Sequence, residues 1–327
     1  MEALPPAPVE LHMAANCQNV AETVQDVLAR RPVLEPVLRA FEPLLSAGES
    51  MTVALSQTLR DAGLHLPALE GERARQGVSL LAGVALPGIA APMRDVAGVL
   101  LPLMGGMQAV APHMEALQAF FLCPVEPGRE DARDALAEAM LAGRSADAIA
   151  EACGVDADVL TFVTGFVLSP VLHALVAVSM PESGEAPWDE GGAWQEGYCP
   201  VCGAFPTIGW LDRPMLDEKN AYLAGGGGKK HLHCSMCGAD WKFLRGACPS
   251  CGKDASGTME ILRESEAAHG ERLDWCTRCK SYCPTVDLRE REAVPNLDAL
   301  ALGMMHLDMV AARRQLRPLR PSFWNVY

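Results

Sequence analysis

The sequence predicts an α+β protein, in which an N-terminal all-α domain is followed by two small metal-binding β modules and a C-terminal helix. Apolar residues recur at helical spacing as far as residue 180, and β-branched alternation is almost absent there. Four Cys-x-x-Cys pairs follow between residues 199 and 279, with short β-like runs between them. We expect domains at residues 1–185, 186–245, 246–290 and 291–327.

The N-terminal domain is expected to consist of amphipathic helices. Pro32 and Gly48 interrupt the apolar pattern, so we place helix boundaries near them. Ser145 is the expected N-cap, and Gly154 the expected stop, of a short helix. The predicted helices cover residues 20–30, 33–45, 51–62, 76–89, 95–122, 129–142 and 145–153.

Residues 159–180 form the most apolar stretch, 22 residues without a formal charge and long enough to cross a bilayer. Pro170, His173 and acidic flanks oppose insertion, and no Lys or Arg anchors either end. A central helix that is buried on all sides has the same composition. We therefore expect a core helix and no membrane insertion.

The helical period is lost after a Pro- and Gly-containing linker at residues 181–198. Glycines 225–228 are expected at a hairpin tip, with Lys229 and Lys230 solvated beside them. A final amphipathic helix is predicted at residues 298–315, and the Phe323–Trp324 pair of the tail should pack back onto the protein or meet a partner. The expected strands cover residues 205–211, 231–233, 241–244, 259–262, 272–275 and 286–288.

The four Cys-x-x-Cys pairs carry the strongest chemical signal. A pair at this spacing presents two thiolates to one metal ion, so two pairs complete a tetrahedral site and four pairs predict two sites. Three pairs continue with glycine, whose positive φ lets backbone N–H groups turn toward sulfur. The predicted metal ligands are Cys199, Cys202, Cys234, Cys237, Cys248, Cys251, Cys276 and Cys279.

An internal duplication favours sequential pairing of the four Cys-x-x-Cys turns, which we call knuckles. Each unit reads knuckle, strand, turn, strand, knuckle and then an aromatic residue, Trp241 or Tyr282. The gaps of 31 and 24 residues within the units suit a hairpin. The alternative joins the Cys234/Cys237 pair to the Cys248/Cys251 pair across ten residues. Four thiolates suit zinc or a single rubredoxin-type iron, and the ligands alone do not separate these metals.

The remaining thiols and histidines carry less chemistry. His231 and His233 flank Cys234 but are better explained as alternate strand residues than as ligands. Cys283 is a spare thiol, with exchange into a metal site as the less favoured interpretation. No phosphate-binding loop or catalytic constellation is present in the sequence, so no enzyme is indicated. Three further cysteines are expected to be small core residues, namely Cys17, Cys123 and Cys153.

The charge of the chain is unevenly placed. The net charge of −14 divides into −16 for residues 1–198, zero for 199–290 and +2 for 291–327. An acidic N-terminal domain repels phosphate backbones, so nucleic-acid binding by the whole chain is disfavoured. The first ten residues have neither the basic residue nor the apolar run of a signal peptide, and clustered reduced thiols indicate the cytoplasm.

Four motifs contain the Cys-x-x-Cys pairs, namely Cys199-Pro-Val-Cys202-Gly-Ala-Phe-Pro206, Leu232-His-Cys234-Ser-Met-Cys237-Gly-Ala-Asp-Trp241, Arg245-Gly-Ala-Cys248-Pro-Ser-Cys251 and Asp274-Trp-Cys276-Thr-Arg-Cys279. At these motifs the chain resembles the FdhE family of formate dehydrogenase accessory proteins. The resemblance is strong over residues 199–283 and compatible elsewhere. It implies a helical domain joined to two rubredoxin-like modules, and it favours two iron ions, with zinc as the alternative.

The resemblance also implies a cytoplasmic, non-enzymatic role. Such proteins bind the catalytic subunit of a molybdenum- or tungsten-dependent formate dehydrogenase and support its maturation. Besides this complex, the sequence leaves open a homodimer. Two other functions stay open: a redox- or iron-responsive protein in which the metal centres or Cys283 change state, and a zinc-ribbon nucleic-acid adaptor that uses Lys229, Lys230, Lys242 and Arg245.

Overall fold

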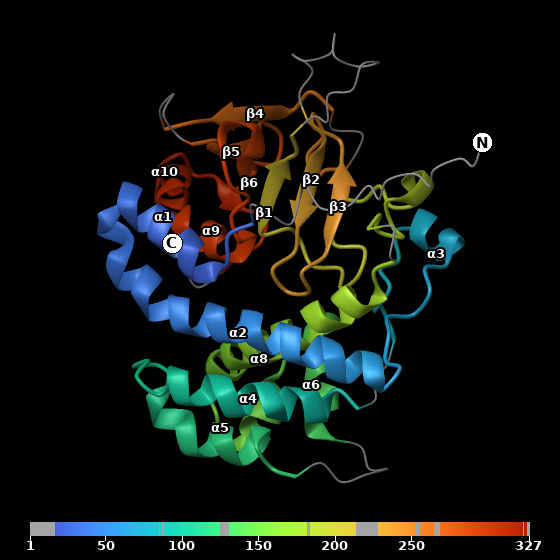
Figure 1. Cartoon of the computed structure of the whole chain (residues 1–327), viewed down its shortest axis with the longest axis vertical. Helices are drawn as coiled ribbons and strands as arrows, with labels where there is room; N and C mark the ends of the chain where they lie inside the picture. The colour runs from blue at the N-terminus through green and yellow to red at the C-terminus, as the bar shows by residue number, and fades with distance from the viewer. Residues whose placement is uncertain are drawn as a thin grey trace, which may run out of the picture.

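The computed structural model describes residues 17–84, 86, 88–124, 131–181, 184–213, 228–252, 256–264, 269–322 and 324–325. Figure 1 shows a sheet with short helices in the upper part and a bundle of helices in the lower part, with helix α2 (Glu35–Asp61) running between them. N-terminal helices are followed by strands, so the predicted α+β class is confirmed.

The helices begin and end largely where local sequence signals stand. Helix α1 has the predicted bounds because Asn19 and Glu22 form a capping box, each side chain accepting a hydrogen bond from the other's backbone N–H. Helix α7 stops at Gly154, which has a left-handed φ of 69°, as predicted. The helices besides α2 are α1 (Val20–Arg30), α3 (Gly71–Arg75), α4 (Ala90–Met104), α5 (Met114–Phe121), α6 (Ala132–Leu141), α7 (Asp147–Cys153), α8 (Ala157–Ser179), α9 (Leu297–Gly303) and α10 (Met305–Arg313).

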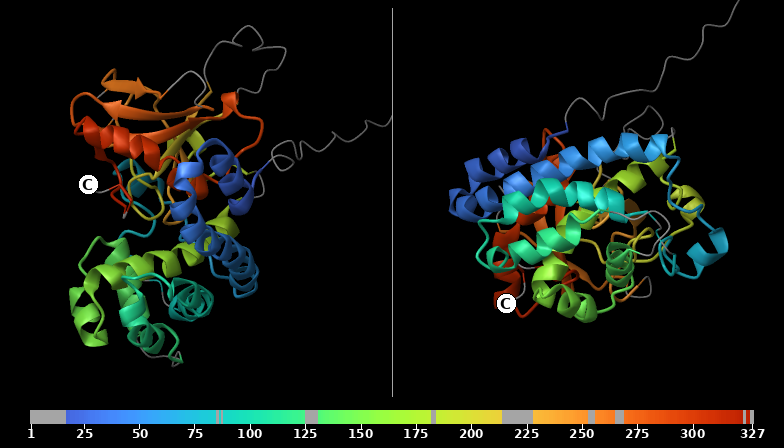
Figure 2. Two further views of the ribbon diagram at one scale, coloured as in Figure 1. Left: turned by 90° about the vertical axis from the view of Figure 1, so that its left-hand side faces the viewer. Right: turned by 90° about the horizontal axis from the view of Figure 1, so that it is seen from below.

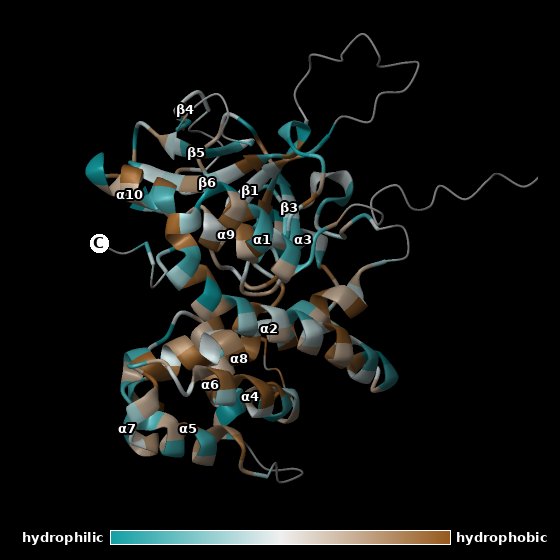
Figure 3. Ribbon diagram, turned by 60° about the vertical axis from the view of Figure 1, so that its left-hand side comes forward, coloured by the Kyte–Doolittle hydropathy of each residue, from teal (hydrophilic) through white to brown (hydrophobic). Residues whose placement is uncertain are grey.

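Helix α8 is the central helix of the bundle. It is long and apolar enough to cross a membrane, but 67% of its most apolar window is buried inside the protein. Its neighbours are α2, α4, α6 and α7, and the ribbon in Figure 3 shows brown, hydrophobic stretches of α4 and α8 close together. The predicted core helix is therefore present, and its hydrophobicity serves packing within the bundle.

Two predicted helix boundaries in the first half of the chain are wrong. The predicted helices at 33–45 and 51–62 are joined, because residues 35–61 form one continuous helix, α2, which passes through Gly48. A Cβ at Gly48 would lie 3.5 Å from Pro170 Cγ, an ordinary van der Waals contact, so Gly48 lies where α2 packs against α8 and does not end the helix. Close packing between these two long helices outweighs the low helix propensity of one glycine.

Of the predicted helix at 76–89, the described residues 76–84, 86, 88 and 89 form turns and irregular backbone instead. The N–H groups of Leu80 and Leu81 donate to the carbonyl oxygens of Pro200 and Val201, at 2.8 and 2.9 Å. These donors therefore bond to a distant segment rather than to a helical turn. Gly77 has a positive φ of 74°, which a helix excludes.

Two other predicted helices are divided. The predicted helix at 95–122 is split into α4 and α5, because the chain leaves the helix at Gly105 and passes through turns and a short 3-10 segment. The predicted final helix at 298–315 is split into α9 and α10 at Met304. Both errors concern boundaries, since the helical character of each segment is confirmed.

The strands form a single sheet, with seven strands in the described residues. The order is β3-β2-β1-β6-β5-β4, and β7 pairs with β6. The join between β1 and β6 is parallel, with Gly209 opposite Thr285. The strands are β1 (Ile208–Leu211), β2 (Lys230–His233), β3 (Asp240–Phe243), β4 (Met259–Leu262), β5 (Glu271–Cys276), β6 (Ser281–Asp287) and β7 (Arg317–Pro318).

The sheet contains the same unit twice. Strands β1, β2 and β3 form one antiparallel meander, and β4, β5 and β6 form the other. In each meander one Cys-x-x-Cys pair precedes the first strand and the other lies at the turn between the second and third strands. The aromatic residues expected after the second knuckles, Trp241 and Tyr282, are both buried on the third strand of their meander. The duplication is thus present as two meanders joined edge to edge.

Two apolar cores lie on either side of α2. One core runs through the bundle and continues to the thiols of the first meander, including Cys199 and Cys234. The other contains residues of α1, the start of α2, the sheet and helices α9 and α10. Helix α1 packs against α9 in this core, and the left view of Figure 2 shows the blue N-terminal helices beside the red C-terminal part of the chain. Trp324 of the tail packs against this second core.

Candidate metal centres

The structure brings the eight predicted ligands together in two groups of four. The first centre contains Cys199, Cys202, Cys234 and Cys237, and the second centre contains Cys248, Cys251, Cys276 and Cys279. In each group the four sulfur atoms lie within 4.8 Å of one another. The first knuckle is therefore grouped with the second and the third with the fourth, as in the sequential arrangement. In each unit the hairpin between two knuckles brings the second one back beside the first.

The spacing of the sulfur atoms fits one ion per centre. The Cys199–Cys237 and Cys202–Cys234 pairs have Sγ–Sγ distances of 3.4 and 3.5 Å, and the Cys248–Cys279 pair has 3.6 Å. A tetrahedral ion with metal–sulfur bonds of about 2.3 Å would hold its sulfurs roughly 3.8 Å apart. Each group could therefore bind a metal ion through four thiolates, and zinc and iron both suit this donor set.

All four knuckles have the same local turn. In each, the carbonyl oxygen of the first cysteine accepts the N–H of the residue four positions later, at 2.8 to 3.0 Å. Gly203, Gly238 and Gly252 occupy that later position with φ between 73° and 79°, as expected from the Cys-Gly dipeptides. Lys280 takes the same left-handed conformation at the fourth knuckle, with φ of 63°.

The thiols within a centre differ in acidity. Hydrogen bonds from the thiols of Cys199, Cys202 and Cys237 lower the pKa of Cys234 well below its ordinary value, and the charge of Arg320 adds to this effect. Burial raises the pKa of Cys279, but hydrogen bonds from Ser281 outweigh it, and the resulting pKa is about 6. Burial raises the pKa of Cys199 well above its ordinary value. Metal binding must displace the remaining protons, so affinity should rise with pH.

The first centre is fixed to the helical bundle by its first knuckle. Ser79 Oγ donates to the Cys199 carbonyl oxygen at 2.9 Å, next to the two backbone hydrogen bonds from Leu80 and Leu81. The segment predicted as a helix at 76–89 is therefore a loop that pairs with the knuckle. It supplies donors to three consecutive carbonyl groups of the metal-binding turn.

Helix α8 holds the second knuckle of the same centre. Ser169 Oγ donates to the Ser235 carbonyl oxygen at 2.9 Å, and His173 Nε2 lies 3.1 Å from the same oxygen. A Cβ at Gly238 would lie 2.8 Å from His173 Nδ1, so the knuckle touches the helix. Ser169 and His173 are four residues apart, on one face of a largely apolar helix, which is the sequence signal that could have identified them.

The second centre lies at the edge of the molecule. Cys248 and Cys276 are buried, but Cys251 and Cys279 are partly exposed. Its small apolar cluster contains, besides the four cysteines, only Met259 among the described residues. Thr258 Oγ1 accepts a hydrogen bond from Cys276 Sγ at 3.4 Å. The two centres thus share their ligand pattern and differ in their surroundings.

The two neighbouring histidines have other partners. His231 stacks on Trp210 with ring centroids 4.0 Å apart. His233 lies 3.1 Å from Asp240 and 3.3 Å from Asp298, and these carboxylates outweigh burial and raise its pKa well above the ordinary value. Their preferred interpretation as strand residues agrees with these contacts. His233 also connects the first meander to α9.

The cysteines outside the centres take three different positions. Cys283 is buried on β6, opposite Asp274 of β5, and belongs to neither group of four. Burial raises the pKa of Cys283 to about 12, so its reactive thiolate form is disfavoured. The prediction that Cys17 and Cys123 are core residues is wrong, because both are exposed just outside helix ends. Cys153 is half-buried.

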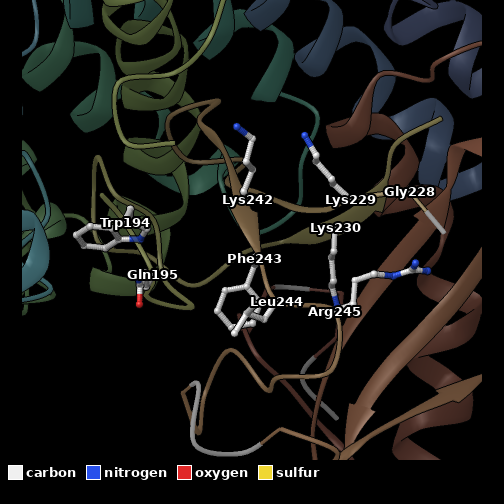
Figure 4. Close-up of a pocket in the computed structure, with 9 residues that line it drawn as sticks. All are labelled: Trp194, Gln195, Gly228, Lys229, Lys230, Lys242, Phe243, Leu244 and Arg245. Carbon is white, nitrogen blue, oxygen red and sulfur yellow. The ribbon is translucent and has the colours of Figure 1, made fainter. Parts of the chain in front are cut away.

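The four cations considered for nucleic-acid binding do not form one free surface. Lys230 is buried, with Nζ 2.7 Å from Asp274 Oδ2, which contradicts its expected solvation. Lys242 Nζ lies 2.8 Å from Glu185 Oε1. Figure 4 shows Lys229 and Lys242 pointing to one side of the hairpin and Lys230 to the other, around a cavity of about 540 Å³. Glycines 225–227 lie outside the described residues.

These observations define a class of protein, a helical scaffold that carries a duplicated four-thiol β unit. No family model matches the chain. In overall fold the chain is similar to the crystal structure of the FdhE protein from Pseudomonas aeruginosa, with a TM-score of 0.55 and 21% identity. That match covers 92% of this chain and 93% of the Pseudomonas chain, and it shows a common fold.

Sequence similarity leads to the same family. The chain is 29% identical over 171 residues to the FdhE homologue of Aquifex aeolicus, which covers 52% of this chain and 53% of that protein. It is 31% identical over 116 residues to the FdhE homologue of Shewanella baltica OS223, covering 35% and 34%. The chain thus spans about half or less of the curated relatives it matches. In sequence and in fold the chain is similar to FdhE proteins.

Proposed function

We propose that this protein is a formate dehydrogenase accessory protein, a maturation chaperone that binds the catalytic subunit of a molybdenum- or tungsten-dependent enzyme. Similarity to the FdhE proteins supports this function. The structural observation that carries it is the pair of four-thiol centres set in one sheet. A centre with four protein ligands is closed, whereas catalytic zinc sites keep a position open for water or substrate. The centres therefore suit a scaffold that presents a binding surface.

The proposed contents of the centres are two iron ions, with zinc as the alternative. When bound, the ion would hold four thiolates together and so join the two knuckles of each meander. The distances between the sulfur atoms do not distinguish iron from zinc, and the preference for iron rests on the family resemblance. The visible absorption spectrum of aerobically purified protein separates them, because ferric tetrathiolate is coloured and zinc is not.

The proposed place of action is the cytoplasm, where the eight thiols would stay reduced and available to metal. We propose no enzymatic activity for this protein itself. The redox alternative based on Cys283 is weakened by the burial of that thiol. The nucleic-acid alternative is weakened by the partners of Lys230 and Lys242.

Gene deletion followed by complementation tests the function. We expect formate dehydrogenase activity to fall in the deletion strain and to return with the parent gene. The Cys234→Ser variant should fail to restore it, whereas the control Cys123→Ser, an exposed thiol outside both centres, should restore it fully. Affinity purification should recover the catalytic subunit with the parent chain. Unchanged enzyme activity in the deletion strain would refute the proposal.

A further inference from the structure

The C-terminal tail is attached to the second centre. Strand β7 pairs in parallel with the start of β6, with Arg317 opposite Ser281 and Pro318 opposite Tyr282. The N–H groups of Arg317 and Leu319 donate to the carbonyl oxygens of Lys280 and Tyr282, both at 2.9 Å. Arg317 Nη2 also lies 3.4 Å from the Cys279 carbonyl oxygen. The tail therefore follows the chain that leaves the last knuckle.

Three residues later the same tail reaches the first centre. Arg320 Nη1 lies 3.6 Å from Cys234 Sγ. The backbone here is held by Asn325, whose Nδ2 donates to the Arg320 carbonyl oxygen at 3.2 Å and whose Oδ1 accepts the Ser322 N–H at 2.7 Å. One short segment thus touches both groups of four thiols.

The charge of Arg320 matches what the first centre would carry with metal. Four thiolates and a divalent ion sum to −2, and this charge would lie among buried residues. The thiolate cluster lies beside the guanidinium, since Arg320 Nη1 is 3.6 Å from Cys234 Sγ, and it can therefore balance this charge. An uncompensated buried charge costs several kcal/mol, whereas a compensated one costs much less.

We propose that Arg320 is the counter-ion of the first metal centre, and that metal binding at this centre strengthens the docking of residues 316–320 on both centres. A loaded centre with a charge of −2 attracts the guanidinium more strongly than the same four cysteines do without metal. Because linkage is reciprocal, the docked tail must also strengthen metal binding at the first centre. This inference rests on the proposed occupancy of the four-thiol sites and goes beyond it by assigning the tail a role.

A chelator titration resolved by cysteine tests the effect on affinity. Full-length protein is loaded with zinc and titrated with a chelator, and alkylation of each cysteine is measured by mass spectrometry. The test variant Arg320→Gln removes the charge and keeps much of the side-chain length, and Arg320→Lys keeps the charge. The matched control is Arg314→Gln, which removes an exposed charge just after α10.

Arg320→Gln should expose the thiols of the first centre at roughly 10- to 100-fold less chelator, the range typical of lost outer partners of metal ligands. The second centre should stay within about twofold of the parent. Arg320→Lys should fall between parent and Arg320→Gln, and Arg314→Gln should match the parent. An unchanged first centre in Arg320→Gln, or equal shifts at both centres, would overturn the inference.

Amide hydrogen exchange tests the docking. The N–H groups of Arg317 and Leu319 should exchange slowly in the zinc-loaded parent and fast after zinc removal or in Arg320→Gln. Equal protection with and without zinc would overturn the docking claim while leaving metal binding intact. A parent whose first-centre thiols gain no protection from zinc would instead overturn the proposed metal site, and this inference with it.

Discussion

The two metal centres have the same knuckles and different roles in the fold. The first centre is buried, its carbonyl groups bond to Ser79, Leu80 and Leu81, and α8 contacts its second knuckle. The second centre is partly exposed and packs mainly on itself and on Met259. A duplicated local motif has therefore acquired two environments from its tertiary neighbours. The comparison indicates that the first centre joins the bundle to the sheet, whereas the second stabilises its own meander.

Loss of one ligand should have the largest effect and should separate the centres. Cys234→Ser removes a ligand from the buried centre and should lower the free energy of unfolding by on the order of 5 kcal/mol or more, a part of the roughly 10–16 kcal/mol available from a structural zinc ion. Cys248→Ser should destabilise the second meander and leave the bundle folded. Calorimetry and metal analysis of both variants measure this difference. Equal loss of cooperative unfolding in both would contradict the comparison.

The buried ion pair between the meanders should come next. Lys230 of β2 and Asp274 of β5 are paired across the joined sheet, and Arg272 lies 2.9 Å from the same carboxylate. Lys230→Met should cost about 3 kcal/mol, because it removes one partner of a buried pair. The exposed control Lys242→Met breaks the pair with Glu185 and should cost less than about 1 kcal/mol. Urea unfolding measures the loss of unfolding free energy in each variant. Similar losses would show that the Lys230–Asp274 pair does not stabilise the contact between the two meanders.

Alanine at equivalent knuckle glycines compares the contacts of the two centres. Gly238 and Gly252 have φ of 73° and 79°, so alanine is strained at both by about 1 kcal/mol. Only Gly238 faces His173, whereas nothing lies within 4 Å of a Cβ at Gly252. We expect Gly238→Ala to cost about 2–3 kcal/mol and Gly252→Ala about 1 kcal/mol. Equal midpoints of thermal unfolding would argue against tight docking of α8.

The hydrogen bonds of the buried aromatic residues should give the two meanders a different dependence of folding stability on pH. Trp241 donates to the Glu196 carbonyl oxygen at 3.1 Å, a group that does not titrate. Tyr282 donates to Asp308 Oδ1 at 2.7 Å, and burial raises the pKa of Asp308 to about 7. The unfolded pKa is near 3.9, so the folded state binds the extra proton between these values, and stability falls as pH rises through this window.

The expected size of this effect is about 2 kcal/mol between pH 5.5 and 7. Asp308→Asn keeps an acceptor for Tyr282 and removes the titration, so its unfolding free energy should fall less over that range. Denaturant unfolding of parent and variant at both pH values gives the comparison. The same pH slope in both proteins would show that Asp308 does not titrate in this range.

The sequence was most informative where structure is local. The four Cys-x-x-Cys pairs, their following glycines and the hairpin-length gaps were enough to predict how the knuckles group, because each meander is built from contiguous chain. Helix α1 was also predicted correctly, since Asn19 and Glu22 cap it locally. These features depend on neighbours only a few residues away.

The errors occur where distant segments decide the structure. Residues 76–89 read as a helix, but Leu80 and Leu81 bond to the knuckle at Pro200 and Val201. The parallel join of β1 to β6 has no sequence pattern of its own, so the single sheet was not predicted. Arg320 follows no motif, and its partner Cys234 lies 86 residues earlier in the chain. Such contacts become visible only in three dimensions.

Native mass spectrometry of the full-length protein tests the central claim most directly. The intact mass, compared with the mass after denaturation in acid, gives the number and identity of bound metal ions. The account predicts two ions per parent chain, one in each group of four cysteines, and one ion in Cys248→Ser, retained at the buried first centre. A folded parent chain that carries no metal ion, or a single ion, would contradict the account.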